Sequence, residues 1–532
     1  MMTKPSKIFI ILLSLVLIFL AVEIIYYVFF LDTWLDEADF AYKPWLTSQD
    51  LAQPFTDFRS KYPPLVFYSQ ALFQSWFGPT LLGSRILSAL FLAASALLLY
   101  AIGKRLGGQW TGLVSLSLLV FNPYLVGFYT AAKDYPQAMF FSLLGLWVLG
   151  GDGSPKKKVL LVSIFFTAAV LIRYNMIPVL GSFWLYIIWH WRSVRYLLLS
   201  ILFSVGIFLV ALIPYLLLDP HYAIIWAVIM FGPLGRFFAT DYFSNFSNSQ
   251  VSFGSDHFKF LIQIFTKYFN LWIIFMASII FTLIKPKTEM KKLLSRHHLL
   301  VFSFFLAMVF FASHIFIPNE FSTHLKFLYV APFLIIAAAG SIGILFRWLN
   351  NNPNTDLKLA LGCFLAVLIT FPAVSTALAE PYIIFFNRLD WRDSDIQRVT
   401  RGGEYLRSVT TSEDVILAIG TAHHSFLAGR LEIPPLINGE FTYYEIADRE
   451  LLERYKFYNF PILLDWLTNK ATVVVFQEGA LGESSVFGHD QEKINLFLTK
   501  VRDNYELIGN LDNAYPKKYS RSGIMQVYRR KQ

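Results

Sequence analysis

The segment IFIILLSLVLIFLAVEIIYYVFF, residues 8–30, is long and apolar enough to cross a membrane as one helix. It follows Lys4 and Lys7, exceeds the apolar core of a typical signal peptide, and has no small-residue cleavage site before Asp32. We therefore expect a retained membrane anchor. The acidic stretch WLDEADF, residues 34–40, comes soon after it and places three carboxylates at the edge of the membrane.

The composition of the whole chain predicts a polytopic α-helical membrane protein. Its 532 residues are 56% hydrophobic and 15% charged, whereas a soluble protein carries about a quarter charged residues. Eleven apolar stretches are long enough to span, if tilt and some short spans are allowed: residues 8–30, 81–103, 111–129, 135–150, 158–172, 174–190, 196–218, 259–284, 298–317, 327–346 and 358–379.

The charges between these stretches predict the orientation of the chain. With the N-terminus in the cytoplasm, the loops near residues 104, 156, 192, 285–298 and 347–358 are cytoplasmic, and all of them are basic. Cytoplasmic loops of membrane proteins collect Lys and Arg. Orientation therefore accounts for most of the net charge of +9, and we expect no nucleic-acid partner.

The composition changes after about residue 385. Strand-like runs at 414–419, 471–476, 505–508 and 523–528 alternate with helix-like runs, which predicts a small α/β domain. We expect a transmembrane domain over 1–384 and an extracytoplasmic domain over 385–532, since an odd number of spans precedes the second. The single cysteine, Cys363, excludes an intrachain disulfide and a thiolate metal cluster.

Charged residues of both signs recur on the predicted outer face. Paired carboxylates can do acid–base chemistry and cations can hold an anionic ligand, so this pattern is typical of a site at one interface. The candidates are Asp36, Glu37, Asp39, Arg59, Lys61, Asp134, Arg173, Glu320, His324 and Lys326.

Several of these residues also have simpler interpretations. Asp134 could be the N-cap of the helix that begins at Tyr135-Pro136, and Arg173 could extend to the interface as a lone arginine at a span end does. His324 could be an interfacial polar residue. We interpret the pair His423-His424 as a surface pair and not as a metal site, because the side chains of adjacent residues in a strand-loop context diverge.

The outer segment 32–80 is rich in aromatic residues and carries Pro63-Pro64. Proline is tolerated in the first turn of a helix, and the positions that follow with helical spacing are Leu65, Tyr68, Ala71, Leu72, Ser75 and Trp76. We expect a helix that lies in the membrane interface.

At these residues the chain resembles the C-type polytopic glycosyltransferases that use polyprenyl-phosphate sugars. Within them it is most similar to the protein O-mannosyltransferase (dolichyl-phosphate-mannose-protein mannosyltransferase-like) and aminoarabinose transferase group. The resemblance rests on Asp36-Glu37, Lys61-Tyr62-Pro63-Pro64-Leu65, Arg85 within GSRILS, Asp134, and the late stretch Lys326 to Pro332.

The resemblance implies an inverting transfer of a sugar from a lipid-phosphate donor to a lipid, glycan or protein acceptor, at the outer face of a prokaryotic plasma membrane. Asp36 would be the base, supported by Glu37, and Asp134 the second acid. Lys61, Arg173 and Lys326 would hold the donor phosphate, and Arg59, Tyr62, Glu320 and His324 would contact substrate. The family often has an Arg-Tyr pair where this chain has Asp39-Phe40. It also often has an Arg where this chain has Lys326, and a lysine cannot make the bidentate phosphate contact of an arginine.

The residues leave three alternatives open. Lysines and arginines can neutralise a leaving phosphate without a cofactor, although Asp36, Asp39 and Asp134 could also hold a divalent metal. A polymerase or ligase of lipid-linked glycans would use related chemistry. A transporter or flippase would place its charges near the bilayer midplane. Here the predicted spans are almost free of charge, and Glu23 in the first span is the exception.

Overall fold

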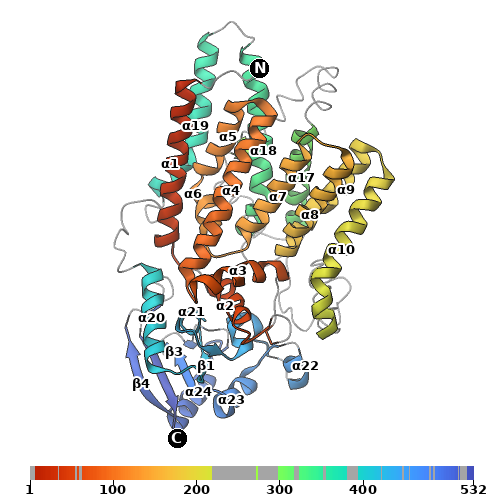
Figure 1. Ribbon diagram of the computed structural model, residues 1–532. Helices are drawn as coiled ribbons and strands as arrows, with labels where there is room; N and C mark the ends of the chain where they lie inside the picture. Colours follow the sequence, from red (N-terminus) through yellow and green to blue (C-terminus); the bar gives the residue numbers. More distant parts are fainter. Residues whose placement is uncertain are drawn as a thin grey trace.

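The computed structural model describes residues 6–33, 35–53, 57–58, 63–218, 271–273, 298–316, 323–350, 355–379, 394–420, 422–445, 448–454, 456–477, 481–482, 484, 486–512, 514–515 and 524–531. Figure 1 shows a bundle of long helices with a small sheet-containing domain at one end. The helices α2 (Leu35–Ser48) and α3 (Pro64–Phe77) lie between the two parts, and α20 (Asp395–Val409) lies alongside the sheet.

The bundle follows the predicted apolar stretches. Its helices are α1 (Lys7–Phe30), α4 (Leu81–Gly107), α5 (Gln109–Val120), α6 (Pro123–Thr130), α7 (Tyr135–Leu149), α8 (Pro155–Ile172), α9 (Ile177–Tyr186) with short turns at Tyr174–Met176 and Ile187–Trp191, α10 (Val194–Leu218), α17 (His298–Phe316), α18 (Thr323–Asn350) and α19 (Thr355–Ala379). Most of the predicted span 259–284 lies outside the described residues.

Among the described residues, four helices are long and apolar enough to cross a membrane, or five if one bent pair counts as a single span. Three shorter apolar helices accompany them. The chain is therefore an integral membrane protein, whereas the number of eleven spans and the orientation remain predictions.

The expected span 111–129 is broken rather than straight. Its two halves, α5 and α6, are bent by 71°. The side chain of Asn122 accepts a hydrogen bond from the amide of Leu125, and Pro123 occupies the first position of α6. Proline has no amide hydrogen to continue the first helix, so a capped second helix begins in a new direction.

The outer segment forms two helices, α2 (Leu35–Ser48) and α3 (Pro64–Phe77), and α3 begins at the predicted proline. Figure 1 shows α3 lying across the end of the bundle. Most of the stripe from which the helix was predicted faces outward: Tyr68, Leu72 and Trp76 are exposed, while Ala71 is buried together with Val66 and Phe67. A helix with an exposed apolar stripe at the end of a bundle is suited to an interfacial position.

The C-terminal domain is the predicted α/β unit. Its five strands are β1 (Val415–Ala418), β2 (Leu431–Glu432), β3 (Val473–Phe476), β4 (Tyr505–Leu511) and β5 (Met525–Arg530), in the order β2-β1-β3-β5-β4. β1 pairs in parallel with β2 and β3, and β5 is antiparallel to β3 and β4. The four predicted strands are present, and β2 was missed because it is only two residues long. The helices are α20, α21 (His423–Ala428), α22 (Arg449–Arg454), α23 (Phe460–Asn469) and α24 (Gln491–Asn504), with a 3-10 segment at Pro434–Thr442.

The prediction of a surface pair at His423-His424 is wrong. Both side chains are buried in α21, and His424 Nε2 lies 2.9 Å from the carbonyl oxygen of Ala514. Burial lowers the pKa of His424 to about 4. The residues form a helix rather than a strand-loop, and the helix turns the imidazole of His424 into the core.

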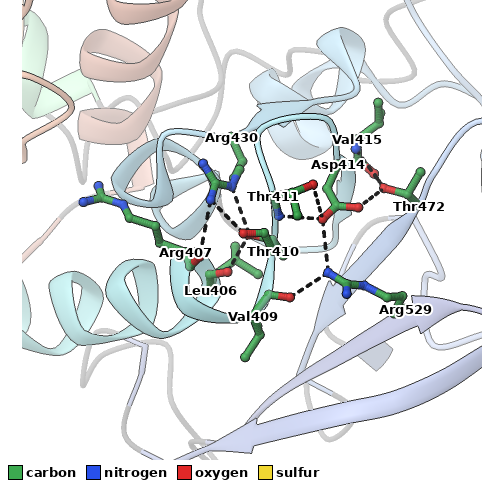
Figure 2. A network of polar contacts seen from close by, with 10 residues as sticks. All are labelled: Leu406, Arg407, Val409, Thr410, Thr411, Asp414, Val415, Arg430, Thr472 and Arg529. Atoms are coloured by element: carbon green, nitrogen blue, oxygen red, sulfur yellow. Dashed lines mark hydrogen bonds and ion pairs between the residues drawn. The ribbon is translucent and has the colours of Figure 1, made fainter.

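Two arginines fix the C-terminal end of α20 to the sheet (Figure 2). Arg430 donates to the carbonyl oxygen of Thr410 at 2.8 Å, and Arg529 donates to that of Val409 at 2.7 Å and to Asp414 at 3.2 Å. The last carbonyls of a helix have no partner within the helix, and cations at this end are favourable.

The domain boundary expected at 384/385 lies outside the described residues.

Candidate active site at the domain end of the bundle

A fully buried ion pair fixes the acidic stretch that follows α1. Arg85, in the second turn of α4, donates to both carboxylate oxygens of Glu37, at 2.9 and 2.7 Å, and neither side chain is exposed. Arg85 also donates to the carbonyl oxygens of Val28 and Leu31 at the end of α1, at 3.3 and 3.0 Å. One guanidinium therefore ties α1, α2 and α4 together.

Glu37 also reaches the loop before α7. Its Oε1 accepts a hydrogen bond of 2.8 Å from the amide of Ala132. Because Asp134 follows two residues later, the same carboxylate that holds α2 also holds the segment that carries the second acid. The geometry gives Glu37 a positioning part in the site.

Asp134 is buried and forms the second ion pair. Arg173, at the C-terminal end of α8, donates to its two carboxylate oxygens at 3.0 and 2.8 Å. Asp134 stands at the N-cap position of α7, but its side chain makes no capping hydrogen bond. The N-cap position predicted for Asp134 is therefore confirmed, but its carboxylate pairs with Arg173 instead of capping the helix.

The guanidinium of Arg173 is also held by two aromatic rings. Its Cζ lies 5.2 Å from the ring centroid of Tyr135 and 5.3 Å from that of Tyr329 on α18. The Arg173 side chain keeps 18% exposure while Asp134 has none. The cation thus lies between the buried acid and the surroundings, where an anionic group can reach it.

The electrostatics of Asp134 follow from this environment. Burial raises the pKa of the Asp134 carboxyl above its ordinary value, and the charge and hydrogen bonds of Arg173 oppose this. A raised pKa brings a carboxyl closer to the range in which acid–base catalysts work.

The helix α2 carries Asp36 and a further ion pair. Asp39 pairs with the buried Lys43 one turn later, and Lys43 Nζ lies 5.6 Å from the ring centroid of Phe58. The backbone of Asp36 lies in α2 directly before Glu37, and its side chain is outside the part that the structure describes.

The C-terminal domain packs directly on α2. The hydroxyl of Tyr42 donates to the carbonyl oxygen of Arg430 at 2.6 Å and accepts from the amide of Glu432 at 2.7 Å. The rings of Tyr42 and Trp45 contact Phe426 in a shared apolar cluster. The site therefore lies where bundle and domain meet.

The structure brings together three of the predicted residues, Glu37, Asp134 and Arg173. The predictions for Arg59, Lys61, Tyr62 and Glu320 lie outside the described residues, as do the side chains of His324 and Lys326 in α18. No ionic role was predicted for Arg85, although a lone arginine inside an apolar span signals a buried partner. Lys43 and Lys133, which are both buried, were also missed.

Within the described ranges, no group of three or more His, Cys, Asp or Glu side chains could hold a metal ion. Asp39 and Asp134 are instead engaged by Lys43 and Arg173.

Comparison with known proteins connects this geometry to a family. Residues 61–218 match the family model of dolichyl-phosphate-mannose-protein mannosyltransferases. No curated protein sequence matches the chain. The family resemblance predicted from the sequence is confirmed over this segment, which includes Arg85, Asp134 and Arg173.

Solved structures share the fold at low identity. ArnT from Cupriavidus metallidurans, bound to undecaprenyl phosphate, is 12% identical with a TM-score of 0.60, over 97% of this chain and 98% of ArnT. The Archaeoglobus fulgidus oligosaccharyltransferase tethered with an acceptor peptide is 11% identical with a TM-score of 0.52, over 98% of this chain and 74% of that enzyme. The AglB oligosaccharyltransferase of the same organism, in complex with an inhibitory peptide and a dolichol-phosphate, has a TM-score of 0.50 at 12% identity, over 98% and 74% of the two chains.

Proposed function

We propose that this chain is a membrane glycosyltransferase that moves a sugar from a polyprenyl-phosphate donor to an acceptor at the extracytoplasmic face. The observation that carries the proposal is the pair of buried ionic contacts, Glu37–Arg85 and Asp134–Arg173, at the domain end of the bundle. The match to the mannosyltransferase family and the lipid phosphates bound by ArnT and AglB support it.

The reaction is a single displacement at the anomeric carbon. A hydroxyl or amine of the acceptor attacks this carbon, and the bond between the carbon and the phosphate oxygen breaks. The lipid phosphate leaves with the bonding electron pair, and the configuration inverts. The proton of the acceptor passes to the carboxylate of Asp36, which later releases it to water.

The cations act on the leaving group. Negative charge develops on the phosphate as the bond breaks, and a fixed cation in a site shielded from water stabilises it. Arg173 is suited to this because its planar guanidinium can bind a phosphate oxygen while it keeps its contact with Asp134. Lys61 and Lys326 are proposed as further phosphate contacts.

Asp134 and Glu37 hold the groups that react. Asp134 fixes the orientation of Arg173, and Glu37 fixes both α2 and the loop that leads to Asp134. Placement of this kind matters because a reacting group displaced by about 1 Å can lose roughly 100-fold in rate.

The proposal is tested with purified protein in lipid nanodiscs, undecaprenyl phosphate carrying a radiolabelled sugar, and membrane extract as the source of acceptor. Asp36→Asn should abolish transfer while the protein remains folded and inserted. The matched control is Asp50→Asn, since Asp50 is an exposed acid just after the same helix. Full activity in Asp36→Asn would remove the assigned base, and absence of transfer from any labelled donor by the wild type would refute the function.

A further inference from the structure

The helix α3 carries two buried glutamines one turn apart, Gln70 and Gln74, which differ in their hydrogen bonds. Gln74 donates from Nε2 to the carbonyl oxygen of Thr80 at 3.1 Å and to the hydroxyl of Ser84, and its Oε1 accepts from the amide of Thr80 at 3.3 Å. Gln70 is equally buried, but neither its Oε1 nor its Nε2 has a hydrogen-bond partner among the described residues.

A third buried glutamine approaches the same helix from the bundle. Gln137 lies near the start of α7, three residues after Asp134, and has no exposure. Its Oε1 accepts a hydrogen bond of 2.8 Å from the hydroxyl of Ser69, the neighbour of Gln70. Its Nε2 has no partner in the described part of the chain.

Unpaired buried amides are rare in native proteins, because a buried donor or acceptor without a partner is destabilising. Gln74 shows that this helix can satisfy a buried amide from within the protein. Gln137 is in the first turn of the helix that Asp134 precedes, and Gln70 follows Ser69, which contacts Gln137. Free amide groups beside a reaction centre indicate a bound polar partner.

The chemistry of these groups defines that partner. A carboxamide is uncharged and offers both a donor and an acceptor, which matches the hydroxyl group. We propose that Gln137 and Gln70, together with Ser69, form a subsite that binds hydroxyl groups on the sugar ring of the donor, and that the sugar is neutral.

This inference rests on the proposed function, because the sugar is placed through its bond to the phosphate that Arg173 would hold. Ser69 is only partly buried, on the flank of α3 between the buried Gln70 and the exposed Tyr68. The sugar would therefore reach the two amides along this flank.

The test measures lipid binding to the purified full-length protein. The dissociation constants of undecaprenyl phosphate and of its mannosyl, glucosyl and arabinosyl forms are determined in detergent. The wild type should bind at least one sugar-bearing lipid about tenfold more tightly than undecaprenyl phosphate, which corresponds to about 1.4 kcal/mol. Gln137→Met and Gln70→Met should each reduce this advantage by about three- to tenfold, as loss of one neutral hydrogen bond does, and leave the binding of undecaprenyl phosphate unchanged.

Gln74→Met is the matched control, with the same substitution on the same helix. It should lower the melting temperature, because it leaves the buried hydroxyl of Ser84 and the half-buried backbone groups of Thr80 without their partner. It should not change how much more tightly the sugar-bearing lipids bind than undecaprenyl phosphate. Gln70→Met should melt at or above the wild-type temperature, because both of its amide atoms are unpaired among the described residues. Gln137→Met also loses the oxygen that accepts from Ser69, so its melting temperature should fall by less than that of Gln74→Met. A clear fall in the melting temperature of Gln70→Met would show that its amide serves the fold, and would overturn the inference.

The two failures can be told apart. If the wild type binds none of the four lipids, the proposed function itself fails, and the subsite with it. If the lipids bind but the sugar adds nothing, or the variants at Gln70 and Gln137 keep the wild-type advantage, only the sugar subsite is refuted.

Discussion

Variants of the ion pair between Glu37 and Arg85 should affect the stability of the protein and its sugar-transfer activity differently. Both side chains are fully buried, and the guanidinium makes two hydrogen bonds to the carboxylate, at 2.9 and 2.7 Å. Removal of one partner leaves the other charge buried without compensation, which costs about 3–5 kcal/mol. We therefore expect Glu37→Gln and Arg85→Met each to lower the free energy of unfolding by about this amount.

The double variant should behave differently from the sum of the single variants. Glu37→Gln with Arg85→Met removes both charges, and replacement of a buried pair by uncharged groups is often close to neutral. Some loss should remain, because Arg85 also donates to the carbonyl oxygens of Val28 and Leu31. We expect the double variant to be more stable than either single variant.

Activity should not recover with stability. The double variant faces the amide of Ala132 with an uncharged carboxamide that Arg85 no longer orients. The 2.8 Å contact to this amide is therefore weaker, and the loop that leads to Asp134 is held less firmly. The assay combines unfolding in mixed micelles with sugar transfer by the same samples. The reasoning would be refuted if the single variants unfold within about 1 kcal/mol of the wild type, the usual range for an exposed pair, or if the double variant regains full transfer.

Three further predictions follow from single contacts. Arg173→Lys should keep the positive charge but lose the planar contacts with Asp134 and the aromatic rings. The KM for the donor should therefore rise about tenfold or more in transfer assays, which is about 1.4 kcal/mol of binding. An unchanged KM would exclude Arg173 from the donor site. Tyr42→Phe should leave the carbonyl of Arg430 and the amide of Glu432 unpaired, cost about 1–3 kcal/mol, and speed proteolysis at the domain junction; a wild-type digestion rate would contradict this. Burial raises the pKa of Glu432 from its ordinary 4.5 to about 8. Between these two pH values the folded protein holds a proton on Glu432 that the unfolded chain has lost. The free energy of unfolding should therefore fall as the pH rises from about 4.5 to about 8. Glu432→Gln should flatten this slope in melting curves recorded across that range, and an unchanged slope would show that Glu432 is not its source.

Much of the bundle could be predicted because a membrane helix is set by local composition. A backbone in lipid must satisfy its own hydrogen bonds, so a long apolar run forms a helix whatever surrounds it. The runs that begin at Ile8 and Leu81 therefore appear as α1 and α4. Asn122-Pro123, a capping residue followed by proline, also indicates the break between α5 and α6. This signal was not used when a single span was predicted over residues 111–129.

The sequence was less informative for the partners of charged residues. Glu37 and Arg85 are 48 positions apart, and Asp134 and Arg173 are 39 apart. Each residue alone also fits a solvated loop, a helix cap or an interfacial side chain. The pair His423-His424 shows the same limit, since local spacing did not reveal that α21 packs against Ala514, 90 positions from His424.

The sequence by itself determined the membrane class, the α/β domain after about residue 385, and the presence of acids and cations at the expected outer face. These features depend on composition and short-range periodicity, which any stretch of chain carries within itself. Only the tertiary structure decided that Glu37 positions α2 and the Asp134 loop, that Arg173 is held between an acid and two rings, and that Gln70 and Gln137 keep unpaired amides beside them. Those roles arise from packing between distant segments, because burial makes an unpaired charge or amide so costly that its partners define what it does.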